Sequence, residues 1–229
     1  MKTAILVDGA FYLHRHHSFF GKENSSDPAK VATNLWTHCV KHIEKNSDEC
    51  LYRIFFYDCP PIEKKLHHPL TNKSVDLSKS PSAIFRKSFH KELIQKRKVA
   101  LRLGYLDDKN GRWKIKDPKI ERKVISGTYS TEQLSEGDYI FHAIQKEVDM
   151  KIGLDIASLA YKKLVDRIVL IAGDSDFVPA AKFARREGIE FILDPMKKHI
   201  REDLQEHIDG LKTTLPNIKK PNRNRDLLK

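Results

Sequence analysis

The sequence contains only three cysteines among its 229 residues, and none of them forms a Cys-x-x-Cys pair. An odd number of unpaired cysteines argues against a disulfide framework or a thiolate zinc site and favours reduced thiols in the cytoplasm. No apolar run approaches the roughly 20 residues that a membrane-spanning helix needs. The short apolar run at the N-terminus is interrupted by Asp8, so we interpret it as a first strand and not as a signal peptide. The sequence therefore predicts a cytoplasmic protein with no membrane segment.

Two common catalytic signatures are absent as well. No GxxxxGK[ST] phosphate loop occurs, which excludes a P-loop nucleotide hydrolase. No GxSxG elbow occurs, which removes the commonest esterase pattern. There are no internal repeats, and the length is ample for one domain but short for two full ones.

Positive charge is concentrated in two segments of the chain. The net charge is +11, but residues 1–60 are neutral and residues 124–211 carry 11 basic and 16 acidic side chains. Residues 61–123 carry 18 basic and 7 acidic side chains, and residues 212–229 carry 6 and 1. A neutral to acidic body flanked by basic segments suits a polyanionic substrate. A lysine-rich solvated surface is the simpler interpretation of the same pattern.

The most informative stretch is IVLIAGDSDFVP, residues 168–179. Its apolar run predicts a buried strand, and Asp174 and Asp176 follow within three residues of Gly173. The chain begins in the same way, because the apolar run 4–7 is followed by Asp8. Two carboxylates on one turn repel each other unless a cation lies between them. Because Mg²⁺ and Mn²⁺ prefer carboxylate oxygens, the pattern predicts a carboxylate metal site.

Further acidic residues occur where they could join this site. Asp58 and Asp194 also end apolar strands, and the carboxyl ends of parallel strands meet at one edge of a sheet. Asp149 and Asp155 lie around the start of the helix before the third predicted strand. Each has a simpler interpretation: Asp58 as a loop cap, Asp194 as part of a common turn before a proline, Asp149 as a helix N-cap, and Asp155 as a solvated helix residue.

The order of predicted elements indicates an α/β fold with a central, mostly parallel sheet. We expect strands over 3–7, 53–57, 167–172 and 189–193, and helices from Pro28, over 81–98, from Asp149, over 178–187 and over 200–211. Asn110-Gly111 predicts a hairpin between strands 99–106 and 112–116. We expect a single domain over 1–211, with a basic insertion over 61–137 and a basic flexible tail over 212–229.

Three segments together resemble a known family. They are ILVDG at 5–9, KEVDMKIGLD at 146–155 and IAGDSDFVPAAKFARREG at 171–188, and they resemble the NYN domain in its LabA-like branch. NYN domains belong to the PIN-like superfamily, whose members have a Rossmann-like α/β sandwich and are typically Mg²⁺- or Mn²⁺-dependent ribonucleases. The resemblance implies that Asp8, Asp149, Asp174 and Asp176 bind metal and act in catalysis, with Asp155 as a further candidate ligand.

The expected function is hydrolysis of RNA by a metal-dependent ribonuclease. The candidate substrate contacts are Ser175, Lys87, Lys91, Arg97 and Lys98. Charge alone does not distinguish RNA from DNA, and the oligomeric state stays open between a monomer and a homodimer. Many relatives carry Asn where this chain has Phe11, which favours a second interpretation: a catalytically weak RNA-binding or scaffold protein with a vestigial metal cleft. Toprim-type enzymes also use an Asp-x-Asp at a strand end, but they pair it with a Glu on the first strand, where this chain has Asp8.

Overall fold

The computed structural model describes residues 1–45 and 47–216. Its centre is a six-stranded parallel sheet in the order β10-β9-β8-β1-β2-β5. The strands are β1 (Lys2–Asp8), β2 (Cys50–Asp58), β5 (Val99–Leu103), β8 (Arg167–Ile171), β9 (Glu190–Asp194) and β10 (Gly210–Leu211). The inner strands are near-continuous apolar runs, as expected for a parallel sheet covered on both faces. The prediction of an α/β sandwich with a mostly parallel sheet is confirmed.

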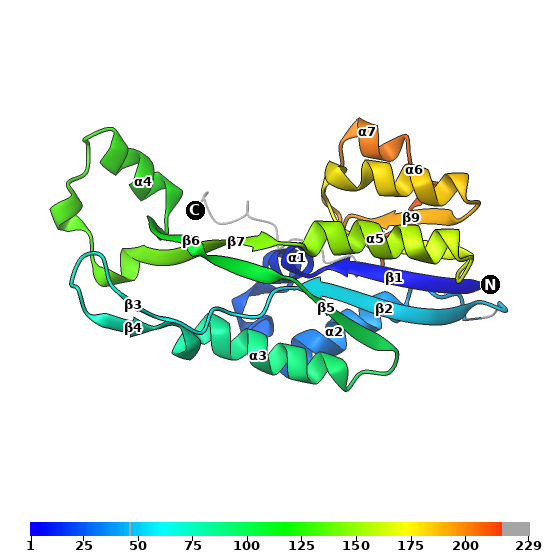
Figure 1. Cartoon of the computed structure of the whole chain (residues 1–229), viewed down its shortest axis with the longest axis horizontal. Helices are drawn as coiled ribbons and strands as arrows, with labels where there is room; N and C mark the ends of the chain where they lie inside the picture. Colours follow the sequence, from blue (N-terminus) through cyan, green and yellow to red (C-terminus); the bar gives the residue numbers. More distant parts are fainter. Residues whose placement is uncertain (46, 217–229) are drawn as a thin grey trace, which may run out of the picture.

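Helices cover both faces of this sheet (Figure 1). One face carries α5 (Val148–Tyr161), α6 (Val178–Arg186) and α7 (Glu202–Gln205), and the other carries α1 (Gly9–Asn24), α2 (Pro28–Val40) and α3 (Pro81–Ile94). Alternate residues of each strand enter the two cores: Leu6 and Leu170 pack toward α5, whereas Ile5 and Val169 pack toward α2. Asp27 caps α2 by accepting from two backbone N–H groups, and Pro28 is its first residue, as predicted.

The strand order reverses direction at β1. From β1 the chain continues to β2 and β5 on one side, and β8, β9 and β10 lie on the other side. The carboxyl ends of β1 and β8 therefore flank the topological switch point, where open α/β sheets bind their ligands. Asp8 is the last residue of β1, and Asp174 follows β8 by three positions. The topology thus places the two aspartate motifs next to each other.

An arm formed by residues 62–80 and 105–146 extends beyond the carboxyl edge of the sheet (Figure 1). Its elements are β3 (Lys65–His67), β4 (Ser74–Asp76), β6 (Tyr105–Ile115), α4 (Pro118–Ile125) and β7 (Tyr139–Lys146). Strands β3 and β4 pair antiparallel, as do β6 and β7. The His68 ring joins the two pairs, because it lies 5.1 Å from the Trp113 ring and 5.3 Å from the Tyr139 ring.

The predicted hairpin between residues 99–106 and 112–116 is wrong. Residues 99–103 form β5, which pairs parallel with β2 at the edge of the main sheet. Residues 105–115 form β6, whose partner is β7. Asn110-Gly111 lies inside β6, where the backbone N–H and the side-chain amide of Asn110 donate to the carboxylate of Asp107. The register between β6 and β7 shifts at this point. The segment 61–137 therefore contributes α3 and β5 to the sandwich.

Two further element boundaries differ from expectation. The helix expected over 81–98 ends at Ile94, and the helix expected over 200–211 is limited to α7, followed by β10. Residues 212–216 of the expected tail pack against α2, where Leu215 is buried. The rest of that tail lies outside the described residues. Among the described residues, no helix combines the length and the apolar character needed to cross a membrane.

Candidate metal centre

Asp8 and Asp174 occupy turns at the switch point of the sheet. The side chain of Asp8 caps α1 by accepting from the backbone N–H of Phe11 at 3.1 Å. Asp174 caps the single 3-10 turn Ser175–Phe177 in the same manner, accepting from the N–H of Asp176 at 3.2 Å. Both carboxylates are therefore fixed to helix starts, where the helix dipole favours negative charge.

Asp149 and Asp176 complete the acidic group. Asp149 lies in the first turn of α5, which packs on β1 and against α6. Burial raises the pKa of Asp8 to about 6, the N–H of Phe11 opposes this, and the charge of Asp149 adds to it. Partial burial raises the pKa of Asp149, and the charges of Asp174 and Asp176 raise it further. Asp149 thus lies within electrostatic reach of each of the other three predicted residues.

No cationic side chain among the described residues forms an ion pair with these four carboxylates. The other three aspartates proposed from the sequence all have partners. Asp155 accepts from Tyr57 Oη at 2.8 Å and from Arg102 Nε at 3.0 Å. An acidic zone that the protein leaves uncompensated fits a divalent cation, whereas Asp155 is already neutralised.

Asp58 is the second aspartate with partners, and it is completely buried. It is held by Arg86 Nη1 and by His90 Nε2, the latter at 2.8 Å, both from α3. Its negative charge nevertheless reaches the site, because it contributes to the raised pKa of Asp8. Asp194 is the third and pairs with two histidines of α2 and the turn after it. The sequence could not reveal these pairings, because the partners are distant in the chain.

The carboxylate oxygens of the four acids do not crowd together. Within the described part of the chain, three ligand atoms of His, Cys, Asp or Glu lie within 4.8 Å of one another only in the group His38, His42 and Asp194. Mg²⁺ keeps several waters and binds through one or two carboxylates directly, so a wider spacing of acids suits it. The donor set, all carboxylate oxygens, fits Mg²⁺ or Mn²⁺ better than a softer metal.

A groove of about 470 Å³ lies between α5 and α6 and begins at the acids. Asp149 and Asp176 line it at one end. Its remaining walls are small or apolar side chains: Met150, Gly153, Ala157, Phe177, Pro179, Ala180 and Phe183. Met150 is 70% exposed and Phe183 is 37% exposed, so both present apolar surface to a ligand in the groove.

Phe11 forms a wall beside the Asp174 turn. A Cβ atom added to Gly173 would lie 2.4 Å from Cε2 of the Phe11 ring, so the ring rests directly on the glycine backbone. The Nζ of Lys198 lies 5.7 Å from the centre of the same ring. The turn that carries Asp174 is therefore held between an aromatic ring and β8.

Replacing Gly173 by Ala is expected to destabilise the protein by about 1–3 kcal/mol, because the methyl group overlaps the Phe11 ring. Urea denaturation measures this loss, and Mn²⁺ affinity should fall with it as the Asp174 turn moves. Gly153→Ala is the matched control, because no atom lies within 4 Å of the added methyl and alanine favours a helix. Equal stability of the two variants would contradict the packing argument.

The four basic residues proposed from the sequence are not gathered at the acids. Lys87 pairs with Glu63 at 2.7 Å, and Lys91 lies one turn further along α3 with its side chain exposed. Arg97 and Lys98 directly precede β5, at the amino edge of the sheet. Ser175 does lie at the site, between Asp174 and Asp176.

Sequence reasoning missed Arg86, His90, His38 and His42. For the last pair a signal was available, because two histidines four positions apart at the end of a predicted helix share one face. For Arg86 and His90 the same spacing occurs on α3. In both cases the aspartate partner lies on a distant strand, so only the fold reveals the group.

An open parallel sheet with unpaired carboxylates at its switch point defines a class of α/β proteins that bind ligands at the strand ends. The family model of the NYN domain matches residues 64–211. Because this is more than half of the chain, the protein belongs to the NYN domain family, which is part of the PIN-like superfamily of nucleases. The match leaves residues 1–63 outside and includes most of the segment interpreted as an insertion.

A crystal structure of a protein of unknown function from Vibrio parahaemolyticus is similar to this chain. The identity is 16%, the TM-score is 0.47, and the alignment covers 92% of this chain and 90% of that chain. No curated protein matches the chain.

Proposed function

We propose that this protein is a metal-dependent ribonuclease of the LabA-like branch, acting in the cytoplasm on RNA phosphodiester bonds. The observation that carries the proposal is the group Asp8, Asp149, Asp174 and Asp176: four carboxylates at the switch point, close enough to repel and without an ionic partner among the described residues. Because the chain belongs to a family of nucleases, we expect this group to act on phosphodiester bonds.

The four aspartates would hold Mg²⁺ or Mn²⁺. When bound, such a metal supplies a Lewis acid for phosphodiester hydrolysis. The protein contributes the placement of the carboxylates, two of which, Asp8 and Asp174, are fixed at helix starts by hydrogen bonds from backbone N–H groups. Because burial raises the pKa of Asp8 to about 6, this carboxyl must lose its proton before it can serve as a ligand.

The substrate strand is proposed to follow the groove between α5 and α6 to the acids. Phe183 and Met150 offer apolar surface on which bases can stack, a contact that tolerates any base. Ser175 is proposed to contact the phosphate beside Asp174. Lys87 and Lys91 on α3 are proposed to attract the backbone from the other side of the sheet, and Arg97 and Lys98 would reach only RNA that extends to the amino edge.

The test uses labelled single-stranded RNA and a matched DNA oligonucleotide, with Mn²⁺, Mg²⁺ or EDTA. We expect metal-dependent cleavage of RNA that falls at least 100-fold in Asp174→Asn while RNA affinity is kept. Asp48→Asn is the control, because Asp48 is an exposed aspartate at the amino edge of the sheet. Equal cleavage of both oligonucleotides would extend the substrate to DNA.

The second candidate function is an RNA-binding or scaffold protein without turnover. The observation in its favour is Phe11, whose ring takes the place of a polar group beside Gly173. The same experiment separates the two functions. RNA binding without cleavage in Mn²⁺ and Mg²⁺, unchanged in Asp174→Asn, would replace the ribonuclease proposal.

A further inference from the structure

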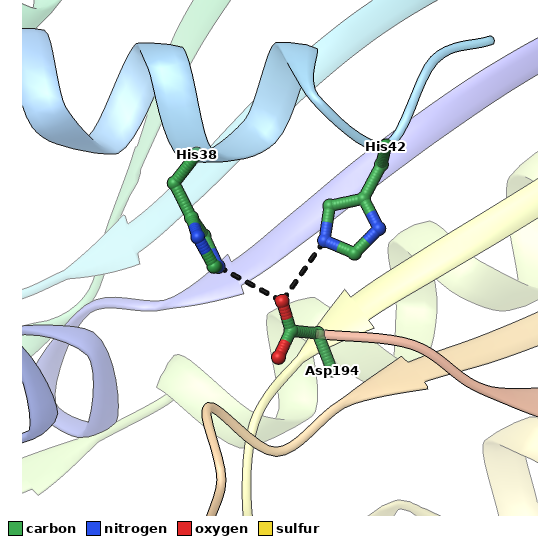
Figure 2. A group of neighbouring side chains, drawn as sticks. All are labelled: His38, His42 and Asp194. Carbon is green, nitrogen blue, oxygen red and sulfur yellow. Dashed lines mark hydrogen bonds and ion pairs between the residues drawn. The ribbon is translucent and has the colours of Figure 1, made fainter. Parts of the chain in front are cut away.

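A second group of metal-ligand side chains lies on the other face of the sheet. His38 belongs to the last turn of α2, and His42 follows four positions later. Asp194 is the last residue of β9, and the alternation along that strand turns its side chain toward α2, because Leu193 faces the opposite core. Figure 2 shows both imidazole rings pointing at one oxygen of Asp194.

The three side chains are nearly inaccessible to solvent and converge closely. His38, His42 and Asp194 are 6%, 1% and 0% exposed. The Nε2 atoms of both histidines lie 2.9 Å from Oδ2 of Asp194, and all three ligand atoms lie within 4.8 Å of one another. Ligands about 2.0–2.2 Å from one tetrahedral zinc ion are separated by about 3.3–3.6 Å. The two contacts with Oδ2 are somewhat shorter, so a small outward shift of the side chains would place the three atoms around one ion.

The contact of His38 with Asp194 requires a positive charge at Nε2, either a proton or a metal ion. Thr214 Oγ1 donates to the carbonyl of His38 at 2.8 Å, so the proton of this hydroxyl is used. The same oxygen lies 2.8 Å from Nδ1 of His38 and must accept from it. In a neutral ring Nε2 then presents a lone pair to the carboxylate. The buried Nε2 lies 2.9 Å from Oδ2 of Asp194, so the two atoms can share a proton or, as proposed below, a metal ion.

Asp194 is also held in position for a cation. Its Oδ1 accepts from the backbone N–H of Met196 at 2.8 Å, which leaves Oδ2 toward the histidines. The turn that makes this possible is strained, because Met196 and Lys197 both have left-handed backbone conformations with φ of 47° and 61°. Arg15 stabilises the turn by donating to the carbonyl of Met196 from Nε at 3.2 Å and from Nη2 at 2.7 Å.

The second histidine meets Asp194 through Nε2, which lies within hydrogen-bond distance of Oδ2 at 2.9 Å. Nδ1 of His42 is buried and has no hydrogen-bond partner within the described part of the chain. Unsatisfied buried polar atoms are rare in folded proteins and call for an explanation such as a bound ion or water. This Nδ1 atom is on the side of the ring away from Asp194, so a water could satisfy it, and the three converging ligand atoms carry the proposal below.

We propose that His38, His42 and Asp194 form a zinc site that is separate from the carboxylate centre. Two imidazole nitrogens and one carboxylate oxygen are a ligand set for Zn²⁺, whereas four carboxylates favour Mg²⁺ or Mn²⁺. A cavity of about 170 Å³ lined by His38, Thr214 and Tyr12 lies beside the group. The ion would fasten α2, β9 and the C-terminal segment together.

The test measures Zn²⁺ uptake by the full chain after removal of metals with EDTA, in the background Asp149→Asn/Asp174→Asn so that the carboxylate centre does not contribute. We expect one equivalent of Zn²⁺ and a rise in melting temperature of about 5–10 °C at 100-fold excess over the dissociation constant. Adding His42→Gln should weaken binding at least 100-fold. Adding Thr214→Val should weaken it about 10-fold, because the threonine only orients His38.

Co²⁺ and X-ray absorption provide readouts that do not depend on the variants folding. Co²⁺ in the same background should give the intense visible bands of a four-coordinate site, and the absorption edge of the zinc-loaded protein should show two imidazole ligands. Absence of uptake by this folded background protein would overturn the proposal, as would a zinc shell of oxygen ligands alone or full uptake by the His42→Gln variant. None of these outcomes depends on RNA cleavage, so the test is independent of the proposed ribonuclease function.

Discussion

Asp8→Asn is expected to abolish RNA cleavage, with a loss of at least 1000-fold, and at the same time to raise the melting temperature of the metal-free protein. Asparagine keeps the side-chain oxygen that accepts from the N–H of Phe11, so the start of α1 stays capped. What disappears is a negative charge that is partly buried and repelled by Asp149. In the wild-type protein this charge lowers the stability of the metal-free fold, and the proposed metal would compensate for it.

The sign of the stability effect follows from the pKa of Asp8, which burial raises from 3.8 to about 6. Below pH 3.8 the carboxyl is protonated in both the folded and the unfolded chain. Between pH 3.8 and about 6 only the unfolded chain releases the proton, so stability falls as the pH rises, and above pH 6 the loss is complete. At pH 7.5 we expect Asp8→Asn to gain about 2 kcal/mol and about 4–8 °C in melting temperature.

Differential scanning calorimetry at pH 7.5 and at pH 4 checks this expectation, because the advantage of the Asp8→Asn variant over the wild type should nearly vanish at the lower pH. Mn²⁺ should reverse the order at pH 7.5 by stabilising the wild type alone. Asp48→Asn controls for the loss of one negative charge and should leave both quantities unchanged. A lower melting temperature for Asp8→Asn than for wild type would show that Asp8 serves the fold and not a cation.

Strands that end in aspartate were predictable because burial on both faces demands uninterrupted apolar runs. The predictions around residues 3–7, 53–57, 167–172 and 189–193 are confirmed for this reason. The strand predicted over 99–106 exists as β5, but its partner was predicted wrongly, because the nearby Asn110-Gly111 suggested a hairpin. Local turn chemistry identifies a turn correctly but does not identify the partner strand.

The sequence predicted which acids follow strands, but it could not separate acids with partners from acids without them. Asp58 and Asp194 follow strands as Asp8 does, yet each meets cationic or imidazole groups from a helix on the α2 and α3 face. His42 and Asp194 are 152 positions apart in the chain. Pairing is decided by which helix covers which strand end, and that depends on the whole fold.

The second large effect is expected on the stability of the protein, from the buried group that Asp58 forms with Arg86 and His90. Replacing Arg86 by Met is expected to destabilise the protein by about 3–5 kcal/mol, because it removes the guanidinium from a carboxylate that is completely buried. His90 remains as the other partner, at 2.8 Å, and cannot by itself occupy both carboxylate oxygens. The double variant Asp58→Asn/Arg86→Met should recover a large part of the loss, since neither charge is then buried without its partner.

Lys87→Met is the matched control on the same helix. Lys87 also pairs with a carboxylate, at 2.7 Å from Glu63, but both side chains are exposed. An exposed pair contributes little, so we expect a change below about 0.5 kcal/mol. Urea denaturation of the three variants measures the contrast. Similar losses for Arg86→Met and Lys87→Met would mean that burial of Asp58 does not control the energy.

Arg86 also connects this pair to the proposed chemistry. The charge of Asp58 already contributes to the raised pKa of Asp8, and the guanidinium of Arg86 offsets that charge. In Arg86→Met the uncompensated carboxylate should therefore raise the pKa of Asp8 further and move the acidic limb of the cleavage profile to higher pH. A purely structural role would lower activity at every pH without moving the limb. The pH profile of the folded Arg86→Met protein, measured with Mn²⁺ beside Asp58→Asn/Arg86→Met, distinguishes the two cases.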